Sequence, residues 1–207
     1  MLLIDKILIA TSNKNKFIEF QDIIKSAFER EKNPAGEKIF ADGIIFAPDF
    51  ANSITIKETG SNYIENAVLK AEAWCKISGL PSLADDSGFE VEALNNAPGI
   101  FSNRIISGTD DIKIKWVLDK LKAVNNENRR ARFVAALALK FPDGRIFISE
   151  GYCNGHVKNF PSGSNGFGYD PIFIPDNYLK TFAEIDPEIK NKISHRAEAF
   201  KNLIKQF

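Results

Sequence analysis

The fold of this chain is decided by residues 6–28, which read KILIATSNKNKFIEFQDIIKSAF. The first five of them, Lys6 to Ala10, are mostly apolar and predict a short β-strand. From Asn13 to Phe28 the apolar residues recur at helical spacing, so that one helix face carries Phe17, Phe20, Ile24, Ala27 and Phe28. A strand joined to a helix by a short polar turn is typical of the opening of an α/β protein.

The rest of the chain changes in character from alternating strands and helices to hairpins. After a surface excursion over Glu29–Gly43, strands are predicted near Ile44–Ala47 and, around a Ser87-Gly88 turn, at Leu83–Asp86 and Phe89–Leu94. Helices are predicted for Ser61–Ile77, from Thr109 to about Val124 and from about Ser194. Pro142-Asp143-Gly144 predicts a hairpin between strands at Arg132–Lys140 and Arg145–Glu150. This order predicts an α/β fold with two lobes around a shared sheet and a cleft between them.

Composition limits the classes of function that the chain can have. Its 207 residues, 44% of them hydrophobic, are enough for one domain over residues 1–207. The 27 basic and 27 acidic residues cancel, so no basic excess points to nucleic-acid binding. Cys75 and Cys153 have no disulfide or zinc spacing and are interpreted as reduced core residues. Without a signal peptide or an apolar run long enough to span a membrane, the expected location is the cytoplasm.

The turn between the first strand and the first helix carries charges of the wrong sign for a helix start. A helix N-terminus has a positive partial charge and favours acidic residues, yet Lys14 and Lys16 stand here. Free backbone N–H groups together with a lysine would bind a phosphate group. The alternative is an ordinary capped turn with solvated lysines. The phosphate-binding motif GxxxxGK[ST] is absent from the chain.

Adjacent carboxylates form the second unusual feature. Asp85 and Asp86 follow an apolar strand, where neighbouring like charges repel each other. A bound Mg²⁺ would relieve this repulsion, because magnesium binds carboxylate oxygens, water and phosphate groups. Glu58, just before a helix, is a plausible third carboxylate. The alternative is a polar turn with one capping carboxylate.

Cations also stand at the start of the last predicted helix. Ser194 is a good N-cap, so His195 and Arg196 would lie at the positive end of that helix, where they could bind phosphate or donate hydrogen bonds to a base. The alternative is a solvated pair on a surface helix. The glycine-rich loop before it contains Phe167 and Tyr169, whose rings could stack on a base. His156 lies in a predicted strand and is interpreted as structural.

These motifs, with several others, occur in an order that resembles the inosine triphosphatase family, the dITP/XTP pyrophosphatases. The resemblance covers nearly the whole chain. It rests on Thr11–Lys16, Glu58-Thr59-Gly60, Glu65-Asn66-Ala67, Ala84–Gly88, Ala97–Ile100, Ser102-Asn103-Arg104, Gly166–Pro171 and Ser194-His195-Arg196.

The resemblance implies a mixed α/β fold with a long central sheet, flanking helices and two lobes around a deep cleft, usually in a homodimer. It also implies Mg²⁺-dependent hydrolysis of ITP, dITP and XTP to the monophosphate and pyrophosphate, which removes deaminated purines from the nucleotide pool. Nucleic acids and membranes are not expected partners.

The resemblance further assigns roles to residues. Asp86 would be the catalytic carboxylate and a magnesium ligand, assisted by Glu58 and Asp85. The triphosphate would be bound by Thr11, Ser12, Asn13, Lys14, Asn15, Lys16 and Lys70. The rest of the substrate would be bound by Ser87, Phe167, Gly168, Tyr169, Asp170, Lys190, His195 and Arg196, with the last three nearest the base.

One departure from the family pattern and three alternative functions remain at this point. Lys57 stands where many relatives have an acidic residue, which leaves Glu58 as the only carboxylate there. A pyrophosphatase for other altered or pyrimidine nucleotides and a catalytically silent nucleotide-binding module are the main alternatives. A two-carboxylate glycosidase is disfavoured, because adjacent Asp85 and Asp86 cannot flank a sugar bond from opposite faces.

Overall fold

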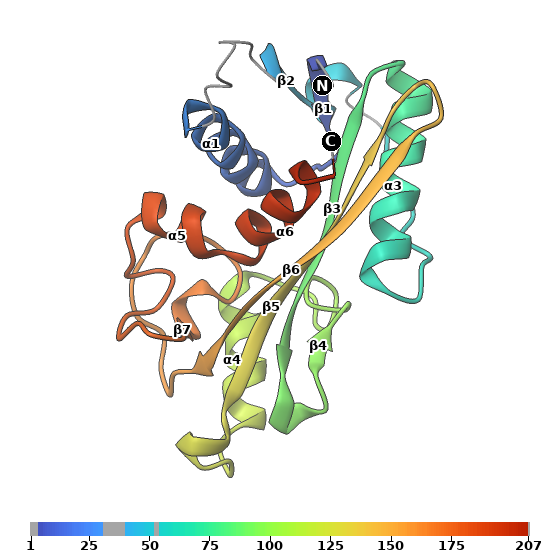
Figure 1. The fold of residues 1–207 in the computed structure, drawn as a ribbon. Coiled ribbons are helices and arrows are strands. Elements are labelled where there is room, and N and C mark those ends of the chain that lie inside the picture. The colour runs from blue at the N-terminus through green and yellow to red at the C-terminus, as the bar shows by residue number, and fades with distance from the viewer. Residues whose placement is uncertain (1–3, 31–39, 52–53, 207) are drawn as a thin grey trace. The chain divides into compact units, whose positions relative to one another are not determined.

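The computed structural model describes residues 4–30, 40–51 and 54–206. In this part of the chain the sheet order is β2-β1-β3-β5-β6-β7, and β4 pairs with β3. Figure 1 labels the strands, which are β1 (Ile4–Ile9), β2 (Phe40–Phe46), β3 (Ser82–Val91), β4 (Ala97–Gly99), β5 (Arg130–Lys140), β6 (Ile146–Val157) and β7 (Phe173–Pro175). The helices are α1 (Lys14–Arg30), α2 (Ala47–Phe50), α3 (Tyr63–Ser78), α4 (Asp110–Lys120), α5 (Pro187–Ile193) and α6 (His195–Ile204).

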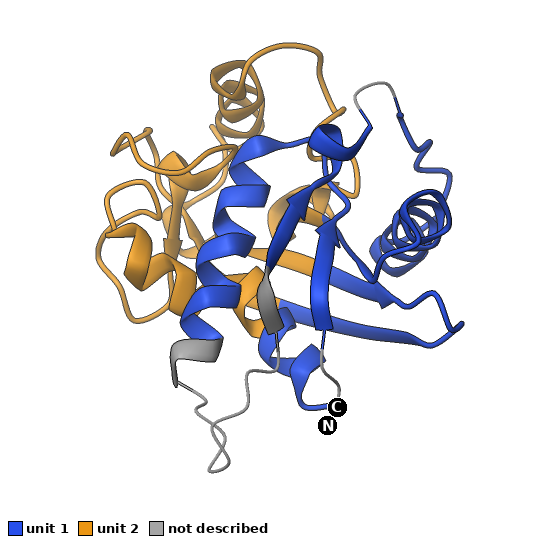
Figure 2. Cartoon of the chain, turned by 90° about the horizontal axis from the view of Figure 1, so that it is seen from above, with its two compact units in different colours: residues 1–86, 136–151, 199–207 blue, residues 87–135, 152–198 orange. Residues whose placement is uncertain are grey.

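The chain forms two compact units, which Figure 2 shows in different colours. Unit 1 comprises residues 1–86, 136–151 and 199–207, and unit 2 comprises residues 87–135 and 152–198. The boundary between the units crosses β3 between Asp86 and Ser87. The predicted class, a mixed α/β fold with a central sheet and flanking helices, is confirmed, whereas the deep cleft stays a prediction.

Unit 1 contains the strand–turn–helix opening that the sequence predicted. β1 pairs in parallel with β2 on one side and with the start of β3 on the other. Ile7, Leu8 and Ile9 are all buried, as expected for a strand of a parallel sheet that is covered on both faces. The helices α1 and α3 lie on opposite sides of β1 and provide that cover (Figure 1).

Helix α3 begins and ends close to the predicted residues because its caps are local. The Asn62 side chain accepts a hydrogen bond from the backbone N–H of Glu65, and Gly79 ends the helix in the left-handed conformation. The buried face of α3 includes the polar side chain of Asn66, whereas Ile64 and Val68 are only partly buried.

Unit 2 is built around an aromatic core. Phe89, Phe133 and Phe173 are buried, with ring centroids 4.9–5.8 Å apart. The Phe182 and Tyr169 rings pack on this group, and helix α4 adds Ile114, Val117 and Leu121 to the same core.

The predicted Ser87-Gly88 turn is wrong, because β3 continues through it as one strand of ten residues. Ser82 and Leu83 pair in parallel with β1, whereas Phe89 to Val91 pair with β4 in antiparallel orientation. These tertiary pairings outweigh the local preference of Ser-Gly for a turn. Helix α5 was also not predicted.

Other predictions are confirmed. The hairpin at Pro142-Asp143-Gly144 joins β5 to β6, and the backbone N–H of Phe141 donates to the carbonyl of Arg145 across it. Ser194 caps α6 by accepting from the backbone N–H of Ala197, and both cysteines are free and buried. Most of the predicted Glu29–Gly43 excursion lies outside the described residues. Among the described helices, none is both long and apolar enough to cross a membrane.

Candidate active site

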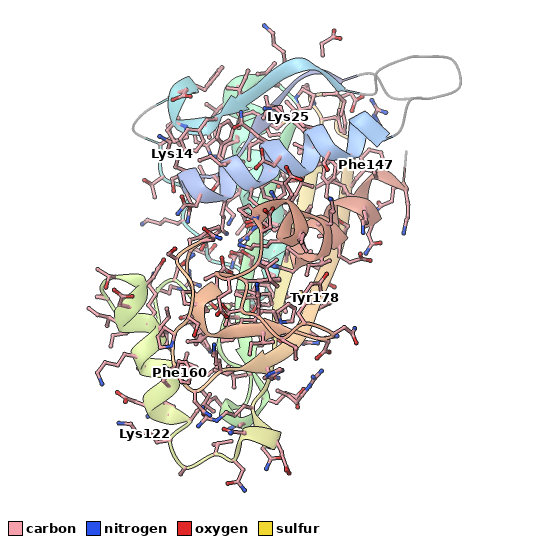
Figure 3. All side chains as sticks on the ribbon, turned by 90° about the vertical axis from the view of Figure 1, so that its left-hand side faces the viewer. Lys14, Lys25, Lys122, Phe147, Phe160 and Tyr178 are labelled. Carbon is pink, nitrogen blue, oxygen red and sulfur yellow. The ribbon has the colours of Figure 1, made fainter. Side chains whose placement is uncertain are left out.

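The turn between β1 and α1 is closed by its own side chains. The backbone N–H groups of Asn15 and Lys16 donate to the Asn13 side-chain oxygen at 2.9 and 3.2 Å, and that of Asn13 donates to the Thr11 hydroxyl. The prediction of free N–H groups is therefore wrong at these three residues, where the turn is capped as in the alternative interpretation. Ser12, Lys14 and Asn15 are exposed, and Figure 3 labels Lys14 at the start of α1.

Lys16 is buried, in contrast to a solvated lysine. Its Nζ lies 2.6 Å from Oδ2 of Asp85, and the two side chains are 8% and 1% exposed. Such a pair replaces the hydration that both charges lose on burial. The Lys16 ammonium and the Asp85 carboxylate therefore neutralise each other. Asp85 is thus the ion-pair partner of Lys16, which was predicted to bind phosphate.

Glu58 and Asp86 converge on Lys70. The Lys70 Nζ lies 2.6 Å from Oε1 of Glu58 and 3.5 Å from Oδ1 of Asp86, and it also donates to the carbonyl of Asp85 at 2.8 Å. We call Glu58, Lys70 and Asp86 the carboxylate cluster. Burial raises the pKa of the Asp86 carboxyl above its ordinary value, Lys70 and Lys16 oppose this rise, and the Glu58 charge adds to it.

The second oxygen of Asp86 has a different partner. The Asn66 side-chain NH₂ donates to Asp86 Oδ2 at 3.0 Å, and the Asn66 oxygen accepts from the backbone N–H of Gly60 at 2.8 Å. Within the described residues, no three His, Cys, Asp or Glu side chains are grouped as metal ligands. The carboxylate cluster consists of two carboxylates, Glu58 and Asp86, around the Lys70 ammonium.

Unit 2 contains a small pocket in which most of the predicted base-binding residues meet. It is lined by Ser87, Gly88, Phe89, Ser102, Phe133, Phe167, Gly168, Tyr169, Asp170, His195 and Arg196. Lys190 is buried beside this pocket, with its Nζ 2.6 Å from Asp170 Oδ2 and 5.0 Å from the centroid of the Phe167 ring. The aromatic walls and cationic groups of this pocket suit a flat heterocycle with acceptor oxygens.

Arg196 and His195 are held in place at the start of α6. Arg196 Nη2 donates to the Ser87 hydroxyl at 2.7 Å, and its guanidinium carbon lies 5.3 Å from the Phe167 ring centroid. The His195 ring stacks on Phe133 with centroids 4.8 Å apart. Both side chains are buried, at 2% and 3% exposure, so the alternative of a solvated surface pair is wrong.

The predicted site residues therefore form one group in each unit. In unit 1, Lys16 pairs with Asp85 and Lys70 pairs with Glu58 and Asp86, whereas the predicted residues Ser12, Lys14 and Asn15 are exposed. In unit 2, the predicted residues line the pocket, except Lys190, which lies beside it. The Ham1 family model matches residues 7–206, which include both groups. The chain belongs to the Ham1 family.

Relatives at the sequence level agree with this family assignment. The chain is 39% identical over 201 residues to a dITP/XTP pyrophosphatase of Streptomyces coelicolor, covering 96% of this chain and 95% of that protein. It is 38% identical over 207 residues to a dITP/XTP pyrophosphatase of Bacillus subtilis, covering 99% and 98%. The predicted family resemblance is thus confirmed.

A solved structure agrees with the fold as well. The HAM1 protein from Coxiella burnetii superposes with a TM-score of 0.80 at 37% sequence identity, and the match covers 100% of this chain and 98% of that one. The α/β arrangement described here is therefore that of the Ham1 family.

Sequence reasoning missed several residues that shape the site of this Ham1-family chain. Asp110, at the start of α4, accepts from the backbone N–H of Gly168 at 2.7 Å and so holds the loop that carries Phe167. The Tyr169 hydroxyl donates to the carbonyl of Ser102 at 2.9 Å. Asp110 stands at a helix start and Ser102 in a motif of the resemblance, but neither contact could be predicted, because each joins residues far apart in sequence.

Proposed function

We propose that this protein hydrolyses dITP, XTP and ITP to the nucleoside monophosphate and pyrophosphate in a Mg²⁺-dependent reaction. The observation that carries the proposal is the convergence of Glu58 and Asp86 on Lys70. Membership of the Ham1 family and the names of the relatives support the choice of substrate. A cytoplasmic location, expected from the sequence pattern, and a homodimer, implied by the resemblance, stay predictions.

The carboxylate cluster has donors that suit Mg²⁺. Magnesium is commonly bound through one or two carboxylates, with water and substrate phosphates completing its ligands. Glu58 and Asp86 would hold the ion, and Asp85 is the weaker candidate because its Oδ2 already pairs with Lys16. When bound, Mg²⁺ would neutralise charge on the triphosphate.

The protein side chains have separate tasks in this reaction. Asp86 Oδ1 would accept a proton from the attacking water, because it is the oxygen on the side of Lys70 and Glu58. Lys70 and Lys16 oppose the negative charge that collects on the phosphates as pyrophosphate leaves. Lys16 meets a phosphate by sharing its ammonium between that group and Asp85.

The pocket of unit 2 selects the base by its 6-position. Hypoxanthine and xanthine carry an oxygen acceptor there, whereas adenine carries an amino donor. Arg196 presents N–H donors in this pocket, so adenine would leave a buried donor without an acceptor. That mismatch costs about 1–3 kcal/mol, which corresponds to roughly 5- to 150-fold in specificity.

A panel of triphosphates tests the proposed function. Pyrophosphate release is measured for dITP, XTP, ITP, dATP, dGTP and a pyrimidine triphosphate, each with and without Mg²⁺. We expect release from the first three in the presence of Mg²⁺, and much slower release from dATP, whose 6-amino group is a donor, and from the pyrimidine triphosphate. Guanine shares the 6-oxygen, so the dGTP rate shows whether its 2-amino group is rejected as well. Release of orthophosphate, a preference for pyrimidines or no turnover of any substrate would contradict the proposal.

Arg196→Ala separates base recognition from phosphate binding. Because Arg196 lies among the pocket residues and outside the carboxylate cluster, we expect kcat/KM for dITP to fall by about 10-fold or more. Inhibition by inorganic tripolyphosphate, which has no base, should change far less. Arg145→Ala is the matched control, because Arg145 also lies over a phenylalanine ring, 5.0 Å from the Phe141 centroid in the β5–β6 hairpin. If kcat/KM for dITP and inhibition by tripolyphosphate fell equally, Arg196 would bind phosphate and not the base.

A further inference from the structure

Asn66 is a buried polar residue of α3 to which neither the family resemblance nor the proposed mechanism gives a task. Its side chain is completely buried, and it bridges the backbone of Gly60 and the carboxylate of Asp86. The orientation of its amide follows from chemistry. The backbone N–H of Gly60 can only donate, so the Asn66 oxygen must face it, and the NH₂ group is left for Asp86.

This amide distinguishes the two oxygens of Asp86. Because the Asn66 NH₂ donates, Oδ2 of Asp86 must accept and cannot carry a proton at the same contact. Oδ1 is the oxygen on the side of Lys70, where Glu58 also lies. Oδ1 makes only the longer contact with the Lys70 ammonium, at 3.5 Å, so it is the oxygen with accepting capacity left for a further donor or a cation.

The same contacts close a ring that sets the separation of the two carboxylates. The Lys70 ammonium pairs with the carboxylates of Glu58 and Asp86. Asp86 accepts from the Asn66 amide, and Asn66 accepts from the backbone N–H of Gly60. Gly60 is two residues after Glu58, which closes the ring. Asn66 and Lys70 are one helical turn apart on the same face of α3.

The helix end that carries this ring is itself fixed. Glu65 Oε2 accepts from the backbone N–H of Ser61 at 2.7 Å, and Asn62 accepts from the backbone N–H of Glu65. The second bond is the N-cap bond of α3, and the first holds the residue just before the cap, so together they fix the first turn of the helix. The ring around Asp86 is thus attached to a rigid helix start.

We propose that Asn66 is a positioning residue for the hydrolysis, which holds Asp86 with Oδ1 as its reactive oxygen. The inference rests on the proposed function and extends it to a residue outside the reacting groups. If Asn66 has this role, removing its side-chain amide slows the chemical step. If Asn66 only stabilised the fold, its loss would lower the melting temperature without slowing turnover by the folded enzyme.

The first test is Asn66→Ala, assayed by pyrophosphate release from dITP. We expect kcat to fall about 10- to 100-fold, as is usual when a group that orients a metal ligand or reacting residue is removed. KM and the affinity for a non-hydrolysable dITP analogue should stay within about threefold of wild type. Asn202→Ala is the matched control, because it removes a side-chain amide that donates to the Glu150 carbonyl at 3.0 Å in the same unit. Its kcat should equal that of the wild type.

Gly60→Ala is the second test, and it decides the matter if Asn66→Ala does not fold. A Cβ at Gly60 would lie 2.7 Å from the Asn66 side-chain oxygen and 2.6 Å from the Glu65 Cβ, so the amide would have to shift although it is still present. We expect a loss of kcat in the same direction as for Asn66→Ala, with analogue binding retained.

A double variant tests whether Asn66 acts through Asp86. In Asp86→Asn, the further change Asn66→Ala should leave the residual single-turnover rate unchanged. A wild-type kcat in folded Asn66→Ala, or a further loss in the double variant, would overturn the inference. A wild-type protein that releases no pyrophosphate would instead refute the proposed function.

Discussion

Asp86→Asn is expected to reduce pyrophosphate release from dITP by about 10²- to 10⁴-fold, the range that a positioned general base supplies. The physical reason lies in its two oxygens. An asparagine at this position would accept from the Asn66 NH₂ with its oxygen, which turns its own NH₂ toward the Lys70 ammonium. The group on the Lys70 side could then neither accept a proton nor bind a cation.

The variant is expected to fold and to bind substrate. Burial disfavours the charged form of Asp86, so a neutral amide of the same shape removes a desolvation cost. Thermal melting and the affinity for a non-hydrolysable dITP analogue check both points. Asp176→Asn is the control, because it removes a carboxylate that pairs with Arg130 at 2.7 Å on the exposed side of unit 2. Near-normal turnover by Asp86→Asn would refute the role given to Asp86.

Asp85→Ala is expected to lower the free energy of unfolding by about 3–5 kcal/mol, the usual cost of removing one partner of a buried ion pair. The Lys16 ammonium would stay buried without the carboxylate that lies 2.6 Å from it. Urea unfolding followed by circular dichroism measures the loss. The double variant Lys16→Met/Asp85→Leu should recover most of this stability, because it removes both charges and keeps the volume apolar.

An exposed ion pair provides the comparison for this second prediction. Asp119→Ala removes a carboxylate that contacts Lys115 and Lys122 at 2.8 Å on the surface of α4. Exposed pairs contribute little, so its urea midpoint should stay close to that of the wild type. If Asp85→Ala were as stable as Asp119→Ala, the buried pair could not be what holds Lys16 in place.

The parts of the fold that could be predicted from the sequence are those governed by neighbouring residues. The cap at Asn62, the helix end at Gly79 and the hairpin at Pro142-Asp143-Gly144 depend on contacts over a few residues. The turn at Ser87-Gly88 was predicted wrongly for the opposite reason. β3 lies between β1 and β5, which come from distant parts of the chain, and it also pairs with β4, so the whole strand stays extended.

The sequence predicted which residues belong to the candidate site better than it predicted which of them contact one another. An apolar pattern cannot identify Asn66 as part of the buried face of α3, because its burial depends on an acceptor twenty residues away. The sequence likewise gave no reason to expect Lys16 to be buried. Burial of its ammonium group avoids a large desolvation cost only because a carboxylate lies beside it.

The sequence alone determined the family, the α/β class and most of the strands and helices, and it predicted which charged residues belong to the candidate site. Only the tertiary structure decided the partners in the ion pairs. Lys16 pairs with Asp85, and Lys70 lies between Glu58 and Asp86. The physical reason is that the energy of a charge depends on its distance from its partner and on its exposure to water. Both quantities are properties of the folded chain, and here they determine which oxygen of Asp86 faces Lys70.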